Sequence, residues 1–385
     1  MRLAICHPFL YVKGGAERVV LKIAKHFDAK IYCALYEPEK TFPEFGDCDI
    51  EVLKTRFFRY MPGGVPIRVR HAVAAGRIFY HKVLPGDYDV INAQGTPSEW
   101  IRHYNSPVVW YSHSPNREAF DLYEARMKGR RLHEKALYWG CLQAYRLLEN
   151  RTVPKIERIF ANSANTQWRL KHYLGVESEV LHPGVDAENY YCAEYREFFF
   201  YPSRITPEKR FEYAIDAFRE FRKSSPRFRD WKLVIAGSLF ADRPEHAAYY
   251  EWLKNYLGSD GRIVVDADQE RLSSLYARCF AVLYSPMNED FGIVPLEALS
   301  SEKPVISVNE GGPKEVVSDG ENGFLVNSPG EMAEKMAFLA ERPELAEEMG
   351  KNGRRLVETR FTWKAFLDRF EAVCRKVKKL DAPPA

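Results

Sequence analysis

Cysteine is scarce and scattered in this sequence. Seven of the 385 residues are cysteines, an odd number, and none of them forms a CxxC pair or a Cys/His spacing typical of a metal site. This pattern argues against a disulfide framework and predicts reduced thiols in a cytoplasmic protein. Excess charge is also missing, because the net charge is only +3 and no basic helix with interleaved aromatic residues of a recognition module occurs. We therefore expect no nucleic-acid partner.

Long apolar runs and two common nucleotide-binding signatures are absent as well. No run approaches the roughly 18 apolar residues of a membrane-spanning helix, which predicts a soluble or peripheral protein. Residues 1–9 lack the apolar core and cleavage site of a signal peptide and predict a first strand instead. Neither GxGxxG nor GxxxxGK occurs in the chain, which excludes the dinucleotide fingerprint and the P-loop.

The periodic segments that are present predict two α/β domains. The length exceeds the usual size of a single core. A buried strand at Arg2–Pro8 is followed by a polar loop and an amphipathic helix at Ala16–Phe27, and the same order recurs after Arg196–Tyr201. Between the two halves, residues 182–189 carry turn chemistry without periodicity, so we place the boundary there. The expected domains are residues 1–185 and 186–360.

A long helical region is expected at Glu118–Arg151. One of its faces is polar, and the other carries apolar and aromatic side chains, namely Tyr138, Trp139, Leu142, Tyr145 and Leu148. That pattern is typical of a helix that packs one face on a domain core.

Two carboxylates flank a predicted loop-to-helix junction in the second domain. The apolar run Ala281–Tyr284 predicts a buried strand, and Gly292 and Pro295 predict a turn followed by a helix that begins near Ile293. Glu289 then lies in the loop beyond the strand's carboxyl end, where open α/β sheets bind ligands, and Glu297 lies one helical turn in.

Phosphate could bind at the same junction. Backbone N–H groups at residues 291–294 would point into the crevice, and a helix N-terminus favours anions. Hydroxyl-binding carboxylates beside phosphate-binding amides suit a sugar nucleotide. The alternative is that Glu297 complements the helix dipole and Glu289 is a solvated loop carboxylate.

Three further positions follow predicted strands. Arg204 and Lys209 bracket the loop after the strand at Arg196–Tyr201, and two cations there can clamp a diphosphate, although a solvated basic loop has the same pattern. His113 ends the strand pattern Pro107–Ser112 and is either a site residue or a structural histidine. Gly15 opens the first helix, where it either marks a turn or lets backbone amides approach an anion closely.

Residues 52–86 contain no acidic side chain. Seven cations are interleaved there with aromatic and β-branched residues, namely Lys54, Arg56, Arg59, Arg68, Arg70, Arg77 and Lys82. Such a segment suits anionic lipid head groups or a phosphorylated acceptor. An ordinary helix with a solvated basic face is the alternative.

Asp266 and Asp268 form an Asp-x-Asp pair that could suggest a divalent metal. The pair directly precedes a predicted helix, however, and Asp268 is well placed as its N-cap. We therefore expect no metal site.

Several of these motifs together resemble the family-4 retaining glycosyltransferases with the GT-B fold. Glu289 and Glu297 with Phe291 and Gly292 between them resemble the family's donor-site motif. Asn309–Glu315, Asp319–Val326, the Arg204-x4-Lys209 spacing, Gly14–Arg18 and the segment His113–Arg117 are similar to its other blocks. The resemblance implies two Rossmann-like domains that face each other across a cleft, with a last helix, Phe361–Leu380, that crosses back onto the first domain.

The resemblance also implies roles for the candidate residues. Arg204 and Lys209 would stabilise the leaving diphosphate, and Glu289 would hold sugar hydroxyls. His113 would be a further catalytic residue, against the donor sugar. Donor contacts would come from Gly15, Phe291, Gly292, Ile293 and Glu297, with domain closure assembling the site. No cofactor or metal is implied.

The implied reaction is transfer of a hexose from a nucleotide-diphosphate sugar to a glycan or lipid-linked acceptor. Likeness to mannosyltransferases at Gly14–Arg18 and His113–Arg117 favours mannose from GDP-mannose, used in glycan or polysaccharide assembly. The enzyme would be cytoplasmic, or peripheral on the cytoplasmic face of a membrane. A sugar-nucleotide epimerase of the same fold and a non-catalytic sugar-nucleotide-binding protein are the alternatives.

Overall fold

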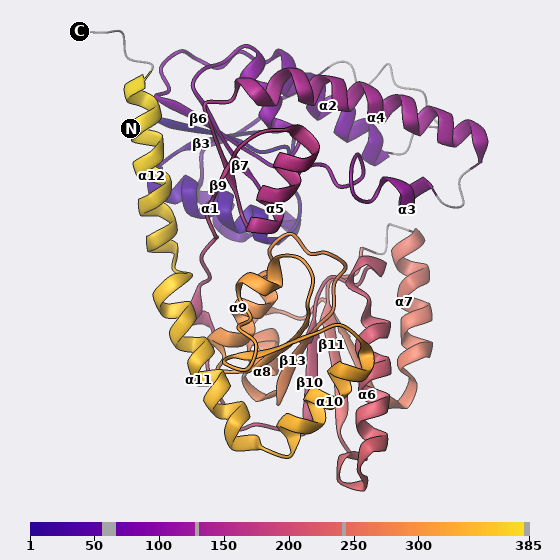
Figure 1. Cartoon of the computed structure of the whole chain (residues 1–385). Helices are drawn as coiled ribbons and strands as arrows, with labels where there is room; N and C mark the ends of the chain where they lie inside the picture. Colours follow the sequence, from indigo (N-terminus) through magenta and orange to yellow (C-terminus); the bar gives the residue numbers. More distant parts are fainter. Residues whose placement is uncertain (56–66, 128–130, 241–243, 381–385) are drawn as a thin grey trace. The chain divides into compact units, whose positions relative to one another are not determined.

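The computed structural model describes residues 1–55, 67–127, 131–240 and 244–380 (Figure 1). The chain divides into two compact units. Residues 1–183 and 366–385 form the N-terminal unit, and residues 184–365 form the C-terminal unit.

The N-terminal unit is built on a parallel sheet of seven strands in the order β5-β3-β1-β6-β7-β8-β9. This is the Rossmann order, in which the chain reverses direction across the sheet between β1 and β6. The strands are β1 Leu3–Cys6, β3 Lys30–Cys33, β5 Ile50–Val52, β6 Val90–Gln94, β7 Val108–Ser112, β8 Arg158–Ala161 and β9 Glu179–Val180, and a small second sheet pairs β2 Phe9–Leu10 with β4 Leu35–Tyr36.

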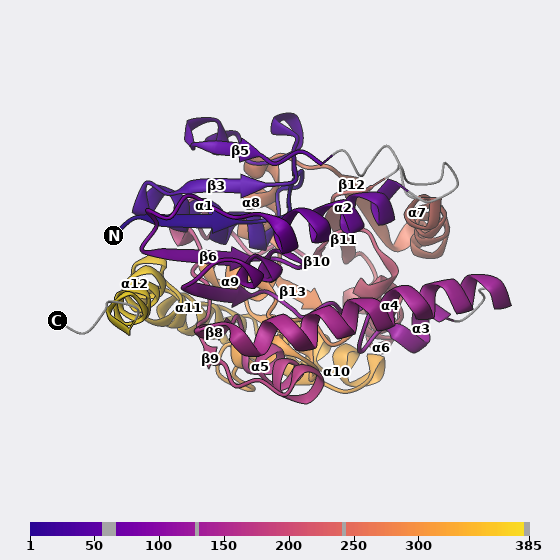
Figure 2. The same ribbon diagram turned by 90° about the horizontal axis from the view of Figure 1, so that it is seen from above.

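Helices cover both faces of this sheet. They are α1 Gly15–Phe27, α2 Ile67–His81, α3 Tyr123–Met127, α4 Leu132–Thr152, α5 Ala164–Arg169 and α12 Trp363–Leu380. On one face α12 joins α1, because Phe370 packs against Phe27 of α1 and Phe160 of β8. On the other face α2 and α4 lie together over the sheet, as Figures 1 and 2 show.

The helical region predicted at Glu118–Arg151 differs from the structure in two respects. It is divided into α3 and α4, and its predicted core face is only partly buried. Leu142 is buried, but Trp139 is 54% exposed. The first turns of α4 carry apolar side chains on both sides, since Leu132 and Leu137 are also exposed, so periodicity alone could not identify the core-facing side.

A pair of buried carboxyl groups anchors α4. Glu149 accepts hydrogen bonds from Trp100 Nε1 at 2.6 Å and from the Tyr145 hydroxyl at 2.9 Å. Glu99 is fully buried beside it. Burial and the neighbouring carboxylate raise the pKa of Glu99 well above its usual value, and burial raises that of Glu149 to about 7. The pair therefore holds a proton at neutral pH.

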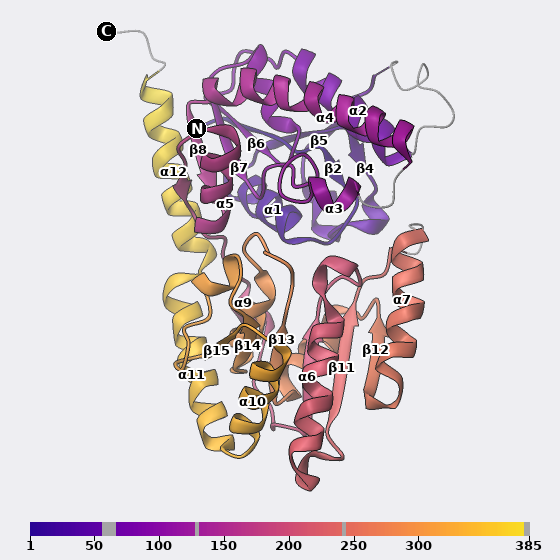
Figure 3. The ribbon, with the colours of Figure 1, turned by 45° about the vertical axis from the view of Figure 1, so that its right-hand side comes forward.

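The C-terminal unit repeats the Rossmann order in a sheet of six parallel strands, β12-β11-β10-β13-β14-β15. Its strands are β10 Phe198–Pro202, β11 Lys232–Gly237, β12 Gly261–Val265, β13 Ala281–Tyr284, β14 Val305–Val308 and β15 Gly323–Val326. Its helices are α6 Phe211–Ser224, α7 Pro244–Leu257, α8 Gln269–Arg278, α9 Ile293–Ser300, α10 Pro329–Ala340 and α11 Pro343–Arg360. Figure 3 shows α6 lying along these strands with α10 beside it.

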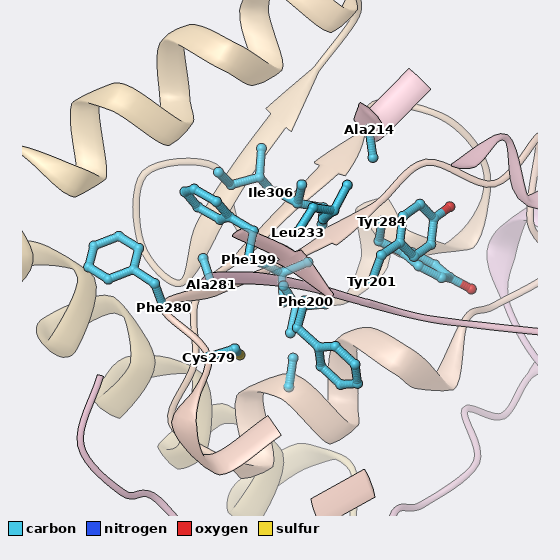
Figure 4. Packing of buried hydrophobic residues seen from close by; sticks show 14 of the residues in the cluster. Phe199, Phe200, Tyr201, Ala214, Leu233, Cys279, Phe280, Ala281, Tyr284 and Ile306 are labelled. Carbon is cyan, nitrogen blue, oxygen red and sulfur yellow. The ribbon is translucent and has the colours of Figure 1, made fainter. Parts of the chain in front are cut away.

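An aromatic core holds the C-terminal sheet together. Phe199, Phe200 and Tyr201 of β10 are fully buried and pack with Phe280, Ala281 and Tyr284 around β13 (Figure 4). Figure 4 also shows Tyr201 and Tyr284 at one end of this cluster, with their hydroxyl groups pointing away from the apolar side chains. The core therefore ends in two hydroxyls at the carboxyl ends of two adjacent strands.

Candidate active site

The candidate donor site lies where the C-terminal sheet reverses its strand order. β10 and β13 are neighbours in the sheet, and the chain runs outward from them in opposite directions. In open α/β sheets this switch point is where ligands bind, beyond the carboxyl ends of the strands. The loops that follow these two strands, residues 203–210 and 285–292, carry Arg204, Lys209 and Glu289.

Lys209 and Glu289 form a partly buried ion pair. Lys209 Nζ donates to Glu289 Oε2 at 2.7 Å, with the two side chains 9% and 21% exposed. The ammonium group also lies 5.9 Å from the centre of the Tyr284 ring. Two residues separated by 80 positions in the sequence are thus joined, and a carboxylate that can accept hydroxyl hydrogen bonds lies beside a cation.

Tyr201 and Ser285 tie the two loops together below this pair. The Tyr201 hydroxyl donates to the Lys209 carbonyl and accepts from the Ser285 backbone N–H at 3.0 Å. Ser285 Oγ donates to the Arg210 carbonyl at 3.0 Å. Burial, followed by the negative charge of Glu289, raises the pKa of Tyr284 well above its usual value, so this phenol stays neutral.

Arg210 is a site residue that the sequence analysis missed. Its Nε donates to the Ser285 carbonyl at 2.7 Å and its Nη2 to the Pro286 carbonyl at 3.0 Å, and its guanidinium pairs with Glu310 at 3.0 Å. These contacts fix the loop that carries Glu289 against the loop that carries Lys209. The only sequence signal was a second cation next to Lys209.

Two glycines let the backbone close around Glu289. Gly311 has φ of +64°, and a Cβ there would lie 2.4 Å from the Glu289 carbonyl oxygen. Gly312 N–H donates to that same carbonyl at 2.9 Å. Gly292 has φ of +85° and directly precedes α9. A Cβ on Gly292 would lie 3.1 Å from the Tyr284 ring. Both positive φ values lie in the region that glycine tolerates best.

The predicted start of the helix near Ile293 is confirmed, because α9 begins there. Phe291 is buried, and Gly292 and Ile293 stand at the helix N-terminus. Glu297 lies one turn in and accepts a hydrogen bond from the Tyr276 hydroxyl at 2.6 Å. Phe291, Gly292, Ile293 and Glu297 thus adjoin the Glu289 loop, as the sequence predicted.

Arg204 differs from Lys209 in its exposure. The residue is exposed, whereas Lys209 is buried. Its loop runs against the end of β11, where a Cβ on Gly237 would lie 1.7 Å from the Ser203 carbonyl oxygen.

Asp268 acts as a helix cap, as predicted. Its side chain accepts from Arg271 N–H at 2.7 Å at the start of α8. Across the described ranges, no group of three or more His, Cys, Asp or Glu side chains is arranged to hold a metal ion.

The N-terminal unit has its own polar cluster at its switch point, between β1 and β6. His113 follows β7 and its Nε2 lies 3.0 Å from Gln94 Oε1 at the end of β6. His7 follows β1; its Nδ1 lies 2.8 Å from the Gln94 carbonyl oxygen, and its Nε2 lies 3.7 Å from Glu17 of α1. Gly15 is exposed at the first position of α1. His7, Glu17 and Gln94 carried no sequence signal, because single polar residues within or just after strands and helices form no pattern.

The basic segment is only partly described. Arg56 and Arg59 lie outside the described residues, and so does the side chain of Arg68. Lys82 pairs with Glu51 at 3.6 Å. Over the parts of the chain that the structure describes, no helix combines the length and apolar character needed to cross a membrane.

Two family models match almost the whole chain between them. The one described as Glycosyltransferase Family 4 matches residues 13–189, and the one described as Glycosyl transferases group 1 matches residues 191–356. The chain belongs to glycosyltransferase family 4. The boundary between the two matches, at residues 189–191, lies a few residues beyond the boundary between the two structural units.

Relatives of this glycosyltransferase span its full length. The alpha-1,3/1,6-mannosyltransferase ALG2 of Dictyostelium discoideum is 25% identical over 98% of this chain and 98% of the relative. The ALG2 protein of Homo sapiens is 27% identical over 97% of this chain and 95% of the relative. The crystal structure of Anabaena Alr3699/HepE in complex with UDP and glucose aligns with a TM-score of 0.73 at 18% identity, covering 98% and 100% of the two chains. This likeness shows that the glycosyltransferase has the GT-B fold.

Proposed function

We propose that this glycosyltransferase is a retaining mannosyltransferase, which transfers mannose from GDP-mannose to a glycan or lipid-linked acceptor. The observation that carries the proposal is the Lys209–Glu289 pair at the switch point of the C-terminal sheet. It combines a cation for a diphosphate with a carboxylate for sugar hydroxyls. The choice of mannose rests on the ALG2 relatives, which are named as mannosyltransferases.

In the proposed reaction, the bond between the anomeric carbon and the diphosphate oxygen breaks while the acceptor oxygen bonds to that carbon on the same face. Arg204 and Lys209 stabilise the negative charge that grows on the leaving diphosphate. The departing phosphate oxygen takes the acceptor's hydroxyl proton. Two side-chain cations supply the positive charge, so we expect transfer to persist in excess EDTA.

The proposed division of labour follows the two units. The C-terminal unit, predicted as residues 186–360, would bind the donor, with Glu289 on the sugar, Glu297 on the ribose and the backbone at Phe291, Gly292 and Ile293 near the phosphates. The N-terminal unit, predicted as residues 1–185 with the last helix, would bind the acceptor, and Gly15 and His113 would contribute to the reaction.

The assignment is tested by a transfer assay with matched donors. The purified protein is incubated with a mannosylated lipid-linked or glycan acceptor and with GDP-mannose, GDP-glucose, UDP-glucose or UDP-N-acetylglucosamine. Release of GDP together with a mannosylated product is expected. Donor consumption without acceptor would favour an epimerase, and binding without product would favour a non-catalytic protein.

We further propose that the N-terminal unit docks on an anionic membrane, where a lipid-linked acceptor would be held. Helix α2 supplies Arg70 and Arg77 and, like the whole of segment 52–86, has no acidic residue. On α4, Leu132, Leu137 and Leu147 are 84%, 70% and 51% exposed. Helical spacing places them on one outward arc with residues 136, 140, 141 and 144, and this arc also has no acidic side chain. Apolar side chains beside cations suit a lipid surface with negative head groups.

Liposome co-sedimentation checks this proposal. Binding to vesicles with phosphatidylglycerol is expected to exceed binding to neutral vesicles and to fall with added salt, since each cation near the surface contributes about 1 kcal/mol. Replacing Arg70 and Arg77 by serine, or Leu137 and Leu147 by serine, should weaken it. Arg262→Ser, which removes an exposed cation from the C-terminal unit, is the matched control. Equal binding to both vesicle types would contradict membrane docking, and the basic segment would then be an ordinary solvated helix face.

A further inference from the structure

Gln94, to which the proposed reaction gives no role, stands at the centre of a hydrogen-bond chain. The chain runs from the backbone of β7 to the His113 ring. Asn92 Nδ2 lies 3.0 Å from the Val109 carbonyl oxygen, Gln94 Nε2 lies 2.7 Å from Asn92 Oδ1, and Gln94 Oε1 lies 3.0 Å from His113 Nε2. Asn92 and Gln94 are fully buried.

The backbone end of this chain fixes the direction of every hydrogen bond in it. A carbonyl oxygen only accepts, so the Asn92 amide nitrogen must face Val109 and its oxygen must face Gln94. The Gln94 nitrogen therefore donates to Asn92, which leaves the Gln94 oxygen facing His113. Because that oxygen also only accepts, His113 Nε2 must carry the proton.

We propose that Gln94 is a positioning residue that holds His113 in its Nε2–H tautomer, so that Nδ1 presents a lone pair to a hydroxyl group of a bound substrate. Within the described part of the chain, no hydrogen bond reaches His113 Nδ1. The identity of the hydroxyl rests on the proposed transferase function, whereas the tautomer rests on the hydrogen-bond chain alone.

The surroundings of His113 keep the ring neutral. Burial and then the charge of His7 lower the pKa of His113 to about 3. Two groups face the ring. One is His7, which follows β1 and is paired with Glu17 of α1. The other is Tyr111 of β7, whose ring centre lies 5.0 Å from that of His113. A neutral ring with Nε2 protonated accepts at Nδ1, whereas an imidazolium would donate there.

The tautomer itself can be measured by long-range ¹H–¹⁵N NMR on the full-length protein labelled at its 10 histidines. The spectrum of His113→Asn assigns the His113 signals by their loss. A protonated Nε2 and an unprotonated Nδ1 are expected between pH 6 and 8. A protonated Nδ1 in the wild-type protein would overturn the inference, whatever the protein's activity proves to be.

Two substitutions of Gln94 then test its role. Gln94→Met removes the acceptor at similar volume, and we expect the Nδ1–H tautomer to become populated and kcat to fall about 10-fold, as for one hydrogen bond of about 1.4 kcal/mol. Gln94→Glu places a carboxylate beside the ring, which should raise the pKa of His113 and add an acid limb to the pH–rate profile that the wild type lacks. Gln167→Met, which loses a single side-chain hydrogen bond to the Ser178 carbonyl in the same unit, should alter neither readout.

The outcomes separate this inference from the proposed function. A lower rate in Gln94→Met with an unchanged tautomer would mean that Gln94 is only structural and would overturn the inference. If Nδ1 is the working acceptor, His113→Asn, whose Oδ1 approximates Nδ1, should retain more transfer activity than His113→Gln, whose Oε1 approximates Nε2. A confirmed tautomer with full activity in both His113 variants would contradict the role of His113 in transfer and leave the tautomer assignment standing.

Discussion

Replacing Arg204 or Lys209 by alanine is expected to lower kcat by roughly 10²–10³, which is the usual cost of removing one group that stabilises transition-state charge. Arg204 and Lys209 would both face the diphosphate as its charge grows. Lys209→Ala also leaves Glu289 without the 2.7 Å contact to Nζ. Some loss of folding stability should therefore accompany it.

Two other cations of the same unit provide matched controls. Lys303 is fully buried, donates to the Ala193 carbonyl at 3.1 Å and lies over the Tyr195 ring. Lys303→Ala should destabilise the protein while leaving kcat of the folded fraction near normal. Arg262→Ala, which removes another exposed arginine of the same unit, is the control for Arg204→Ala and should leave kcat near normal. Thermal unfolding and single-turnover rates of all four variants separate a loss of stability from a loss of catalysis. Near-normal turnover in both Arg204→Ala and Lys209→Ala would show that these cations do not stabilise the leaving diphosphate.

The second large effect is expected from Glu289→Gln. The amide keeps an oxygen that can accept from Lys209 Nζ, so the loop should keep its place. Hydrogen bonds from sugar hydroxyls to a carboxylate are stronger than those to an amide. Losing about 1.5–3 kcal/mol should lower kcat by roughly 10–150-fold, while GDP should bind with unchanged affinity.

Glu297→Gln is the comparison that gives this result its meaning. Glu297 is held by the Tyr276 hydroxyl one turn into α9 and is proposed to bind the ribose. Its substitution should raise KM and weaken GDP binding more than it lowers kcat. If instead Glu289→Gln abolished GDP binding and Glu297→Gln did not, the two carboxylates would have been assigned to the wrong parts of the donor.

Much of the candidate donor site could be predicted from the sequence because its signals are local. The strand Ala281–Tyr284, Gly292 and Pro295 lie within 15 residues of each other. Together they indicate a strand, a turn and a helix start, and the general rule for parallel sheets places Glu289 at the ligand-binding edge. The structure confirms the strand and the helix start at the predicted residues.

The contacts between distant segments could not be predicted in this way. Whether Lys209 meets Glu289 depends on β10 lying next to β13, which follows from the strand order of the sheet and not from either segment. Arg210 acts through the backbone carbonyls of Ser285 and Pro286, which any residue type could supply, so the sequence around them carried no signal. Gln94 acts through the side chains of Asn92 and His113, and its contact with His113 depends on β6 lying next to β7. The prediction that Trp139 lies on the core face was wrong for a different reason. A helix with apolar residues around most of its circumference has no unique core face.

The proton NMR spectrum of the product formed from GDP-α-mannose tests the central claim most directly. Lys209 Nζ holds Glu289, and Lys209 is one of the two cations proposed to face the diphosphate, so Glu289 is poorly placed to act as a base on the opposite face of the sugar. The acceptor should therefore enter on the leaving-group side, and the anomeric signal of the new linkage should be that of an α-mannoside. A β-mannoside would contradict the account, because it would require a base on the other face and a different role for Glu289.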